Sequence, residues 1–385
     1  MSEVKFCKIC IYPSSKPHIE FNKDGVCSGC YAYYNRPKID WLQRESKLKE
    51  ILKKYKNLSP DYYHCIVPSS GGKDSHFQTI KMLEYGLNPL IVNVVPDKLA
   101  EIGRYNMENM RYLGVDTIQV SLDPKVRRKI NKFALQTVGD ISWPEHITIF
   151  TVPVKVSVNM KIPLLIWGES AENELGGPID RLDKDILDRR WLEEFGGLLG
   201  LRTNDIADIL GIPQKKLVQY TYPSKEELKE CGSTGLFLGQ YIPWDGHKNA
   251  EIAKKYGLKV YEKDVEGSIV NYENLDNVYM RIHDYFKYLK YGFDRVTDWC
   301  CTHIRRGRMT RAEAVKINQE KSGKFPETYL GHNISEILSE IDMERQEFVE
   351  ICDKFTNKSL FLCNNNGNLI KDENGNLTLK NNDYK

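Results

Sequence analysis

The segment Ser69-Ser-Gly-Gly-Lys-Asp-Ser75 constrains the fold of this chain more than any other part of its sequence. It follows an apolar run at 62–67 and overlaps the start of helical spacing at 74–85. Paired glycines let the backbone approach a polyanion closely, and the N-terminus of the following helix offers unpaired N–H groups. The segment therefore predicts a phosphate-binding turn between a buried strand and a helix.

The side chains of this turn support the same interpretation. Lys73 adds a point charge, and Asp74, an acidic residue inside a phosphate-binding turn, is expected to hold Mg²⁺. The turn is not a Walker A motif, because Val67 stands where that motif has glycine and Asp74 stands where it has Ser or Thr. An ordinary glycine-rich turn without a ligand is the alternative. The predicted nucleotide-binding residues of the turn are Ser69, Ser70, Gly71, Gly72, Lys73, Asp74 and Ser75.

Segments of strand and helix character alternate around this turn. Strands are expected at 62–67, 90–95, 117–122 and 162–167, with 235–242 as a further candidate, and helices at 74–85, 100–112 and 124–138. This alternation is typical of an α/β fold in which a doubly wound, mostly parallel sheet carries helices on its faces. We place this domain, which contains the phosphate-binding turn, at 60–245.

The rest of the chain divides into four shorter units. Residues 1–38 are too few for a hydrophobic core of their own, 39–59 have the spacing of a linker helix, and 246–356 have mostly helical patterns. Thr310-Arg-Ala-Glu313 is a capping box that predicts the start of a helix. The Asn-rich tail, 357–385, is either a small β-meander on Asn-Gly turns or a frayed end.

Two cysteine pairs lie in the N-terminal unit, Cys7-Lys-Ile-Cys10 and Cys27-Ser-Gly-Cys30. Their spacing, C-x2-C-x16-C-x2-C, is typical of a structural zinc knuckle with four thiolate ligands. The metal would supply the folding free energy that so short a segment cannot gain from burial. Four unligated cysteines and a redox or iron–sulfur role are the alternatives. A closed site of this kind has no open coordination position, so we assign it no catalysis.

The charge of the chain is balanced, with 55 Lys and Arg residues against 53 Asp and Glu residues and a formal net charge of +2. Such a balance provides no bulk field that attracts nucleic acid or an anionic membrane. The longest apolar runs, 89–96 and 162–168, are far shorter than the roughly 18–20 residues of a membrane-spanning helix. The first residues contain no apolar stretch of a signal peptide, so we expect a cytoplasmic protein.

Three glutamates follow the strand candidate at 162–167, at the edge where doubly wound sheets bind ligands. They are Glu169, Glu172 and Glu174. Their carboxylates can hold Mg²⁺, orient an amide or accept a proton from an incoming amine. A solvated acidic loop is the alternative.

A group of arginines stands on a turn that leads into the helix predicted after Thr310. Its members are Arg305, Arg306, Arg308 and Arg311. Guanidinium groups make forked contacts to phosphate, so a nucleotide or pyrophosphate ligand would account for the group. A solvated basic face is the alternative.

The pattern Ser70-Gly-Gly-Lys-Asp-Ser75 resembles the PP-loop of the ATP pyrophosphatase superfamily. The resemblance implies that ATP is cleaved between its α and β phosphates, that AMP is placed on a substrate oxygen and that the loop holds pyrophosphate. It also implies that adenine lies against the backbone at the end of the second strand, around Asn93 and Val94. We count Gly168 among the nucleotide-binding residues as well.

Four motifs in one order narrow the resemblance: the cysteine pairs, the SGGKDS loop, the Trp167-to-Gly177 stretch and Arg305-Arg-Gly-Arg-Met-Thr-Arg311. Together they resemble the N-acetyl sugar amidotransferase family of bacterial surface-polysaccharide and flagellin-sugar biosynthesis, over about residues 5–356. This resemblance implies conversion of a sugar N-acetyl group to an acetamidino group through an adenylylated imidate, with ATP, Mg²⁺ and structural Zn²⁺ as cofactors. It implies catalytic roles for Lys73, Asp74 and the three glutamates.

The same resemblance gives the expected partners. The substrate is expected to be a nucleotide-activated acetamido sugar. No glutaminase-like nucleophile elbow surrounds any cysteine, so ammonia is expected from a separate glutaminase subunit, with a cyclase-like ammonia-channelling subunit as a second candidate. We expect neither a membrane nor a nucleic acid as a partner.

Two other interpretations stay open. Several tRNA-thiolating enzymes also combine a PP-loop with zinc-binding cysteine pairs, but here no second cysteine is paired by spacing with Cys65 before the loop. Bound tRNA or labile iron and sulfide would favour this alternative. The other interpretation is an adaptor that binds a partner through its zinc knuckle and has a degenerate phosphate loop.

Overall fold

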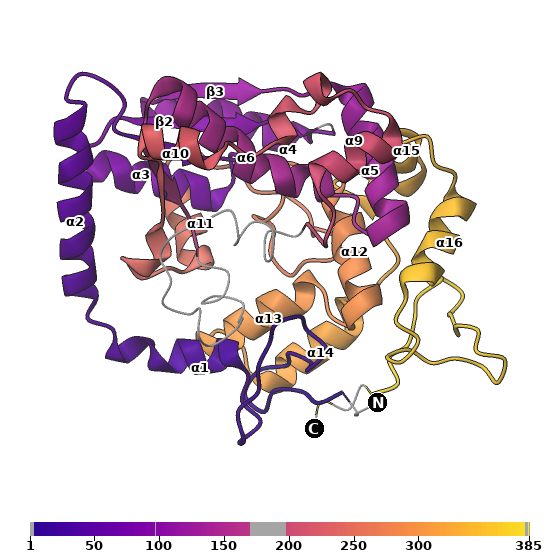
Figure 1. Ribbon diagram of the computed structural model, residues 1–385. Helices are drawn as coiled ribbons and strands as arrows, with labels where there is room; N and C mark the ends of the chain where they lie inside the picture. The colour runs from indigo at the N-terminus through magenta and orange to yellow at the C-terminus, as the bar shows by residue number, and fades with distance from the viewer. Residues whose placement is uncertain (1–3, 97, 170–197, 382–383, 385) are drawn as a thin grey trace.

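The computed structural model describes residues 4–96, 98–169, 198–381 and 384, and a parallel sheet in the order β3-β2-β1-β4-β5 lies at its centre (Figure 1). The strands of this sheet are β1 (Cys65–Pro68), β2 (Pro89–Val94), β3 (Asp116–Val120), β4 (Leu164–Trp167) and β5 (Thr234–Phe237). Each neighbouring pair is parallel. The predicted doubly wound α/β fold is therefore confirmed, and the candidate at 235–242 supplies the fifth strand.

The order of the strands creates a switch point in the sheet. The chain adds β2 and β3 on one side of β1 and then returns to add β4 and β5 on the other side. Open α/β sheets bind ligands outside the carboxyl ends of their strands at such a point. The predicted phosphate loop follows β1, and Glu169 follows β4, so both lie at this edge.

Alternate residues of the central strands pack into two separate cores, one on each face of the sheet. Val67 of β1 packs with α2 (Trp41–Leu58) and α3 (Lys73–Glu84). Ile66 points to the opposite face and packs with α6 (Trp143–Met160). Successive side chains of a strand alternate between faces, so these two cores bury the sheet on both sides. Its strands therefore have continuous apolar sequences.

The other helices described in this part connect the strands of the sheet or follow its last strand, β5. They are α4 (Glu101–Asn109), η2 (Met110–Leu113), α5 (Pro124–Val138), α9 (Thr203–Leu210), η4 (Gln214–Lys216), η5 (Val218–Tyr220), α10 (Lys225–Cys231), η6 (Leu238–Gln240) and α11 (Gly246–Lys255). The helices predicted at 74–85, 100–112 and 124–138 correspond to α3, to α4 with η2, and to α5. The predicted linker helix corresponds to α2, whose N-cap Asp40 accepts a hydrogen bond from Gln43 N at 3.0 Å.

The sequence pattern predicts no helix where α6 lies. Its segment contains Pro153 in the interior and a run of β-branched residues, both of which disfavour a helix. The helix nevertheless contacts β1, β2 and β4, and it buries Val152 and Val154 against the sheet. Tertiary burial thus outweighs the local preference of this segment.

A helical region follows the α/β part, as predicted. Its elements are α12 (Met280–Tyr291), α13 (Arg295–Arg305), α14 (Arg311–Lys321), β6 (Thr328–Tyr329), β7 (His332–Asn333), α15 (Ile334–Ser339) and α16 (Arg345–Phe355). Thr310 caps α14 in a capping box with Glu313, which confirms that predicted helix start. The N-terminal α1 (Ser28–Asn35) lies near α13 in Figure 1, and Cys30 of α1 belongs to one buried cluster with Cys300 and Cys301 of α13. The short η1 (Arg36–Lys38) follows α1.

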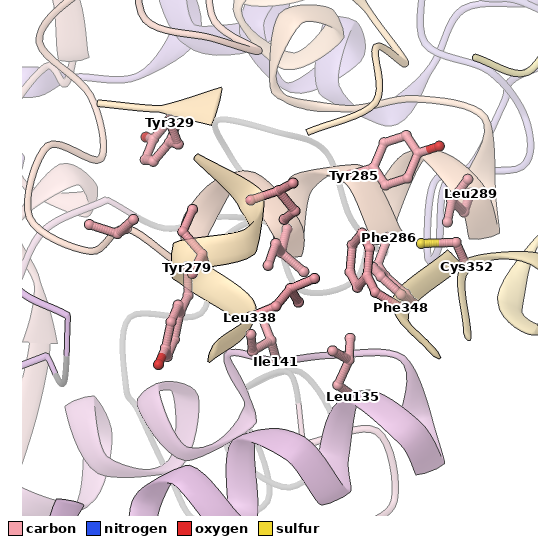
Figure 2. Close-up of a cluster of buried hydrophobic side chains, with 14 of the residues drawn as sticks. Leu135, Ile141, Tyr279, Tyr285, Phe286, Leu289, Tyr329, Leu338, Phe348 and Cys352 are labelled. Atoms are coloured by element: carbon pink, nitrogen blue, oxygen red, sulfur yellow. The ribbon is translucent and has the colours of Figure 1, made fainter. Parts of the chain in front are cut away.

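One buried cluster joins this helical region to the α/β part. Figure 2 shows Phe286 of α12 facing Phe348 of α16, with Leu135 of α5 beneath them. The rings of Phe286 and Phe348 lie 6.0 Å apart. The core is therefore continuous across residue 245, where the two units were predicted to meet.

The described part of the tail is folded against this core. Bridges join Phe361 to Leu379, Cys363 to Leu369 and Lys371 to Leu377. Phe361 is fully buried, and its ring lies 5.2 Å from that of Tyr288. Of the two alternatives for the tail, these observations favour the paired arrangement over a frayed end.

No helix among the described residues is both long enough and apolar enough to cross a membrane.

Phe361→Ala tests whether the tail contributes to the core. We expect it to lower the free energy of unfolding by about 3–5 kcal/mol, because it leaves a cavity at a fully buried ring. Ile370→Ala, in the same tail but 46% exposed, is the control and should change that free energy by less than about 1 kcal/mol. Denaturant titration measures both. Equal effects of the two substitutions on the free energy of unfolding would contradict the packing of Phe361 in the core.

Candidate nucleotide-binding site

Close packing requires glycine in the loop between β1 and α3. Gly71 has a φ of +78°, and a Cβ there would lie 2.8 Å from the backbone nitrogen of Met107 in α4. Gly72 is the N-cap residue of α3, so the loop leads directly to the helix N-terminus. This arrangement leaves the first N–H groups of α3 at the carboxyl edge of the sheet, where they can bind an anion.

Hydrogen bonds attach the loop to the neighbouring strand. Asn93 Nδ2, at the end of β2, donates to the carbonyl of Ser69 at 2.7 Å, and Ser69 N donates to Val92 O at 2.9 Å. Ser69 Oγ in turn accepts from Gly71 N at 3.0 Å. Asn93 therefore positions the loop, a role that the sequence did not indicate.

Lys73 is the buried cation of the site, with 6% of its surface exposed. Its Nζ lies 2.6 Å from Asp74 Oδ2 and forms a second ion pair with Glu273. Burial alone would lower the pKa of Lys73, but the carboxylates of Asp74 and Glu273 outweigh burial and raise that pKa above its usual range. Lys73 is therefore a fixed positive charge beside the loop. Asn249 Nδ2 of α11 holds the other oxygen of Asp74 at 2.9 Å.

Glu273 is a site residue that sequence reasoning missed, because it lies 200 residues from Lys73 and belongs to no recognisable motif. Its segment is packed tightly against α4. Ala100 N donates to Asp276 O at 2.9 Å, and a Cβ on Gly103 would lie 2.4 Å from the Cα of Asp276. The fold therefore fixes the segment 273–276 over the phosphate loop.

Two adjoining cavities open at the loop. The smaller, of about 90 Å³, is lined by the loop from Ser70 to Ser75 and by Glu273 and Asp276. The larger, of about 340 Å³, is lined by Ser69, Asn93 and Val94 and reaches His146. Ser70, Asn274 and Asp276 line both. A phosphate-sized space thus adjoins a cavity in the usual size range for small-molecule ligands, and the predicted adenine-contacting residues lie in the larger one.

Carboxylates around the loop provide oxygen ligands of the kind that Mg²⁺ prefers. Burial and the charge of Glu145 and of Glu273 raise the pKa of Asp276 to about 6. Desolvation of its carboxyl group and the charge of Asp74 raise the pKa of Glu169 to about 7. Burial likewise raises the pKa of Asp74. Carboxylates that raise one another's pKa values are favoured in their charged form by a divalent cation, so the residue set fits a bound Mg²⁺.

The structure accounts for only part of the predicted Trp167-to-Gly177 stretch. Gly168 lies where a Cβ would approach Gln78 Nε2 to 2.4 Å, so close packing requires a glycine there. Glu169 lies at the carboxyl end of β4, where the residue as a whole is exposed but its carboxyl group lies within range of the charges of Asp74 and Lys73. Glu172 and Glu174 lie outside the described residues.

The predicted arginine group is divided between two places. Arg308 makes a forked pair with the carboxylate of Asp245, at 2.8 and 3.1 Å, and Arg306 Nη2 donates to Trp244 O at 2.8 Å. Asp245 is the N-cap of α11, and a Cβ on the next residue, Gly246, would lie 3.1 Å from Cε of Lys73. Arg306 and Arg308 thus hold the start of α11 beside the phosphate site.

The other two arginines contact the N-terminal cysteine unit. Arg311 donates to Cys10 O at 3.1 Å and to Cys7 O at 3.4 Å. Arg305 is buried, and its guanidinium lies 5.7 Å from the ring centre of Tyr12. Arg305 and Arg311, which were predicted to bind nucleotide or pyrophosphate, therefore contact the cysteine unit in this structure.

The four N-terminal cysteines form a single buried cluster. All are fully buried, and their sulfur atoms lie within 4.8 Å of one another. The Sγ atoms of Cys10 and Cys27 are 3.6 Å apart, and those of Cys7 and Cys30 are 3.9 Å apart. Tetrahedral zinc with Zn–S bonds of about 2.3 Å separates its sulfur ligands by about 3.8 Å. The donor set therefore fits a structural zinc ion, and Arg311 holds the carbonyls of two of its residues.

Comparison with known protein families finds a match in sequence over part of the chain. Residues 266–372 match the family described as "LPS biosynthesis protein WbpG-like, C-terminal domain". That region contains Glu273 and Asp276, and it continues into the tail. No curated protein sequence matches the chain.

Among solved structures, the NMN synthetase from Francisella tularensis is similar over 59% of this chain and 99% of its own, with 13% sequence identity and a TM-score of 0.27. A likeness at this level is too weak to support an argument about this chain.

We expect Cys10→Ser to release the metal of the cysteine cluster and to lower the free energy of unfolding by more than about 3 kcal/mol, because metal binding is folding free energy for this unit. Metal analysis and thermal denaturation measure the two effects. Cys363→Ser, which lies outside the cluster, is the matched control. A variant that loses zinc without losing stability would show that the ion is dispensable for folding.

The raised pKa values of Glu169 and Asp276 predict how binding depends on pH. Mg²⁺-nucleotide must compete with protons for these carboxylates, so its affinity should fall as the pH drops through about 7 and then about 6, by up to about tenfold per unit for each displaced proton. Calorimetry across this range measures the slope. The double variant Glu169→Gln and Asp276→Asn should bind more weakly at high pH and lose the slope.

The same shifts predict the opposite trend for the stability of the ligand-free protein. A carboxyl group whose folded pKa is raised is stabilised by protonation, so the free energy of unfolding should rise as the pH falls through these values. Denaturant titration without nucleotide measures this. Stability and binding that changed in the same direction would contradict the assignment of the two carboxyl groups.

Proposed function

We propose that this chain is an ATP-dependent amidotransferase of surface-polysaccharide biosynthesis. In this proposal it converts an N-acetyl group of a nucleotide-activated sugar to an acetamidino group and releases AMP and pyrophosphate. The observation that carries the proposal is the loop of Ser69 to Ser75 at the switch point of the sheet. It presents buried Lys73 and a helix N-terminus beside a cavity of about 340 Å³.

The proposed reaction has two displacements. The amide oxygen attacks the α-phosphorus of ATP, a P–O bond forms, and the bond between the α-phosphorus and its bridging oxygen breaks as pyrophosphate leaves. Ammonia then attacks the imidate carbon, the C–O bond to AMP breaks, and ammonia loses a proton. Adenylylation is needed because an amide oxygen is a poor leaving group, whereas AMP is a good one.

The residues of the site suit these steps. Lys73 and the N–H groups of the loop would stabilise the charge that develops on pyrophosphate. Glu169, whose pKa is about 7, is suited to take the proton from ammonia at neutral pH. Mg²⁺ held by Asp74 and Asp276 would neutralise phosphate charge.

The substrate class and the partners rest on sequence likeness. The WbpG-like match covers the segment with Glu273 and Asp276, and the matching family is described as one of LPS biosynthesis. The order of the four motifs resembles the N-acetyl sugar amidotransferase family. We therefore propose a nucleotide-activated acetamido sugar as substrate, with ammonia supplied by a separate glutaminase subunit and channelled by a cyclase-like subunit.

The thiolation alternative needs a reactive thiol near the loop. Cys65 is fully buried within β1, and burial raises the pKa of its thiol far above the usual range. A thiol in that state is inert. We therefore do not propose sulfur transfer.

Pyrophosphate release tests the proposed function. With ATP, Mg²⁺, ammonium and a panel of nucleotide-activated acetamido sugars, release should depend on one sugar, whose product carries NH in place of oxygen by mass spectrometry. Lys73→Met should lower the rate by about 10²-fold or more, because it removes a preorganised charge. Glu262→Gln, at an exposed position of the helical region, should leave the rate unchanged.

Bulk tRNA serves as a parallel acceptor in this assay. Release only with tRNA would overturn the proposal in favour of RNA modification. Absence of ATP binding would overturn it in favour of the adaptor.

The separate source of ammonia makes a further prediction. The purified chain should turn over with ammonium but not with glutamine, because the chain contains no glutaminase-like motif. Ammonia formation from glutamine by the chain alone, measured directly, would refute the need for a partner.

A further inference from the structure

Three side chains outside the nucleotide site form a compact cluster. Asp140 lies in the connection between α5 and α6, His146 lies in the first turn of α6, and His283 lies on α12. One ligand atom from each lies within 4.8 Å of those of the other two. The cluster therefore joins two residues of the α/β part to one residue of the WbpG-like region.

Both imidazoles turn their Nδ1 atoms toward the carboxylate of Asp140. His283 Nδ1 lies 2.8 Å from Oδ1, and His146 Nδ1 lies 3.2 Å from Oδ2. The two rings lie 5.0 Å apart at an angle of 80°. Two converging imidazole nitrogens and one carboxylate make a donor set suited to zinc and similar transition metals, whereas Mg²⁺ prefers oxygen ligands.

The buried carboxylate of Asp140 requires a positive charge close to it. The side chain of Asp140 is 5% exposed, and the two histidine side chains are 21% and 23% exposed. A buried carboxylate is costly unless a cation balances it. Lys290 lies within electrostatic range of Asp140, but its Nζ donates a hydrogen bond to Val138 O. Either a proton on one imidazole or a metal ion can supply the charge.

One member of the cluster, His146, also lines the larger cavity. His146 lines that cavity together with Ser142, Glu145 and Asn277, and Ser69 and Ser70 of the phosphate loop line it as well. Catalytic zinc sites commonly have three protein ligands and leave the fourth position to water or substrate. An ion held by this cluster would have its open position available to a ligand in the cavity.

We propose that Asp140, His146 and His283 bind a divalent transition-metal ion of the zinc class, separate from the ion of the cysteine cluster. The open coordination position takes an oxygen or nitrogen donor from a ligand in the cavity. The ion also ties α12 to the α/β part. This proposal does not depend on the amidotransferase function, because it concerns only the donor set.

Metal content tests the proposal directly. The full chain, loaded with Zn²⁺ and freed of loosely bound ions by dialysis, should hold a second ion beyond that of the cysteine cluster. Asp140→Asn and His283→Gln should each lose this second ion, because each removes a ligand while keeping a side chain of similar size. His332→Gln, on β7 and outside the cluster, is the matched control and should keep both ions.

Cobalt substitution distinguishes the two sites by their ligands. The wild-type chain should show absorption of a thiolate-bound ion together with that of a nitrogen- and oxygen-bound ion. Asp140→Asn should remove only the second component. Cys10→Ser should remove only the first, provided that circular dichroism shows it folded.

Two results would overturn the proposal. The first is a wild-type chain that holds only the thiolate-bound ion at saturating metal. The second is an unchanged metal content in both Asp140→Asn and His283→Gln when these variants are folded. Either result would mean that a proton balances Asp140 and that the histidines serve only to hydrogen-bond it.

Discussion

The ion pair between Lys73 and Glu273 links the two halves of this structure. A lysine in the first turn of α3 is nearly excluded from solvent, and a buried ammonium group is stable only when carboxylates compensate for its lost hydration. Asp74 provides one carboxylate locally, and Glu273 provides the other from the WbpG-like region. The helical region must therefore close over the phosphate loop before the loop has its observed charge, and the tight contact of Gly103 with Asp276 fixes that closure.

The sequence predicts the parts of the site that are encoded locally. The phosphate loop, the four cysteines and the strands of the sheet each depend on residues close together in the chain, so their spacing and apolar runs are sufficient signals. Helix α6 was not predictable in this way, because Pro153 argues against a helix and only burial against the sheet outweighs it. Glu273 was missed for a related reason: nothing near it in the chain indicates its contact with Lys73.

The arginine group shows why residue type alone does not determine a ligand. A guanidinium binds carboxylates, carbonyl oxygens and phosphate by the same forked geometry. In this structure Arg308 uses it on Asp245, and Arg311 uses it on the carbonyls of the cysteine unit. The sequence shows a dense positive charge but not which oxygen atoms the fold brings to it. Two of the four arginines therefore support the start of α11 beside Lys73, and two support the cysteine unit.

The larger cavity connects the two groups of chemistry-bearing residues. The phosphate loop forms part of its wall, and His146 of the Asp140 cluster forms another part. The two-step transfer proposed above would need an activated intermediate that stays protected from water while the nucleophile approaches, and a cavity walled by both parts of the chain would provide such protection. The segment 273–276 contributes to the walls of both cavities and also carries the partner of Lys73, so one fixed segment sets both the charge at the loop and the shape of the larger cavity. Nucleotide phosphates bound beside Lys73 would share its charge with Glu273, so the nucleotide and the segment that walls the cavity meet at one buried cation.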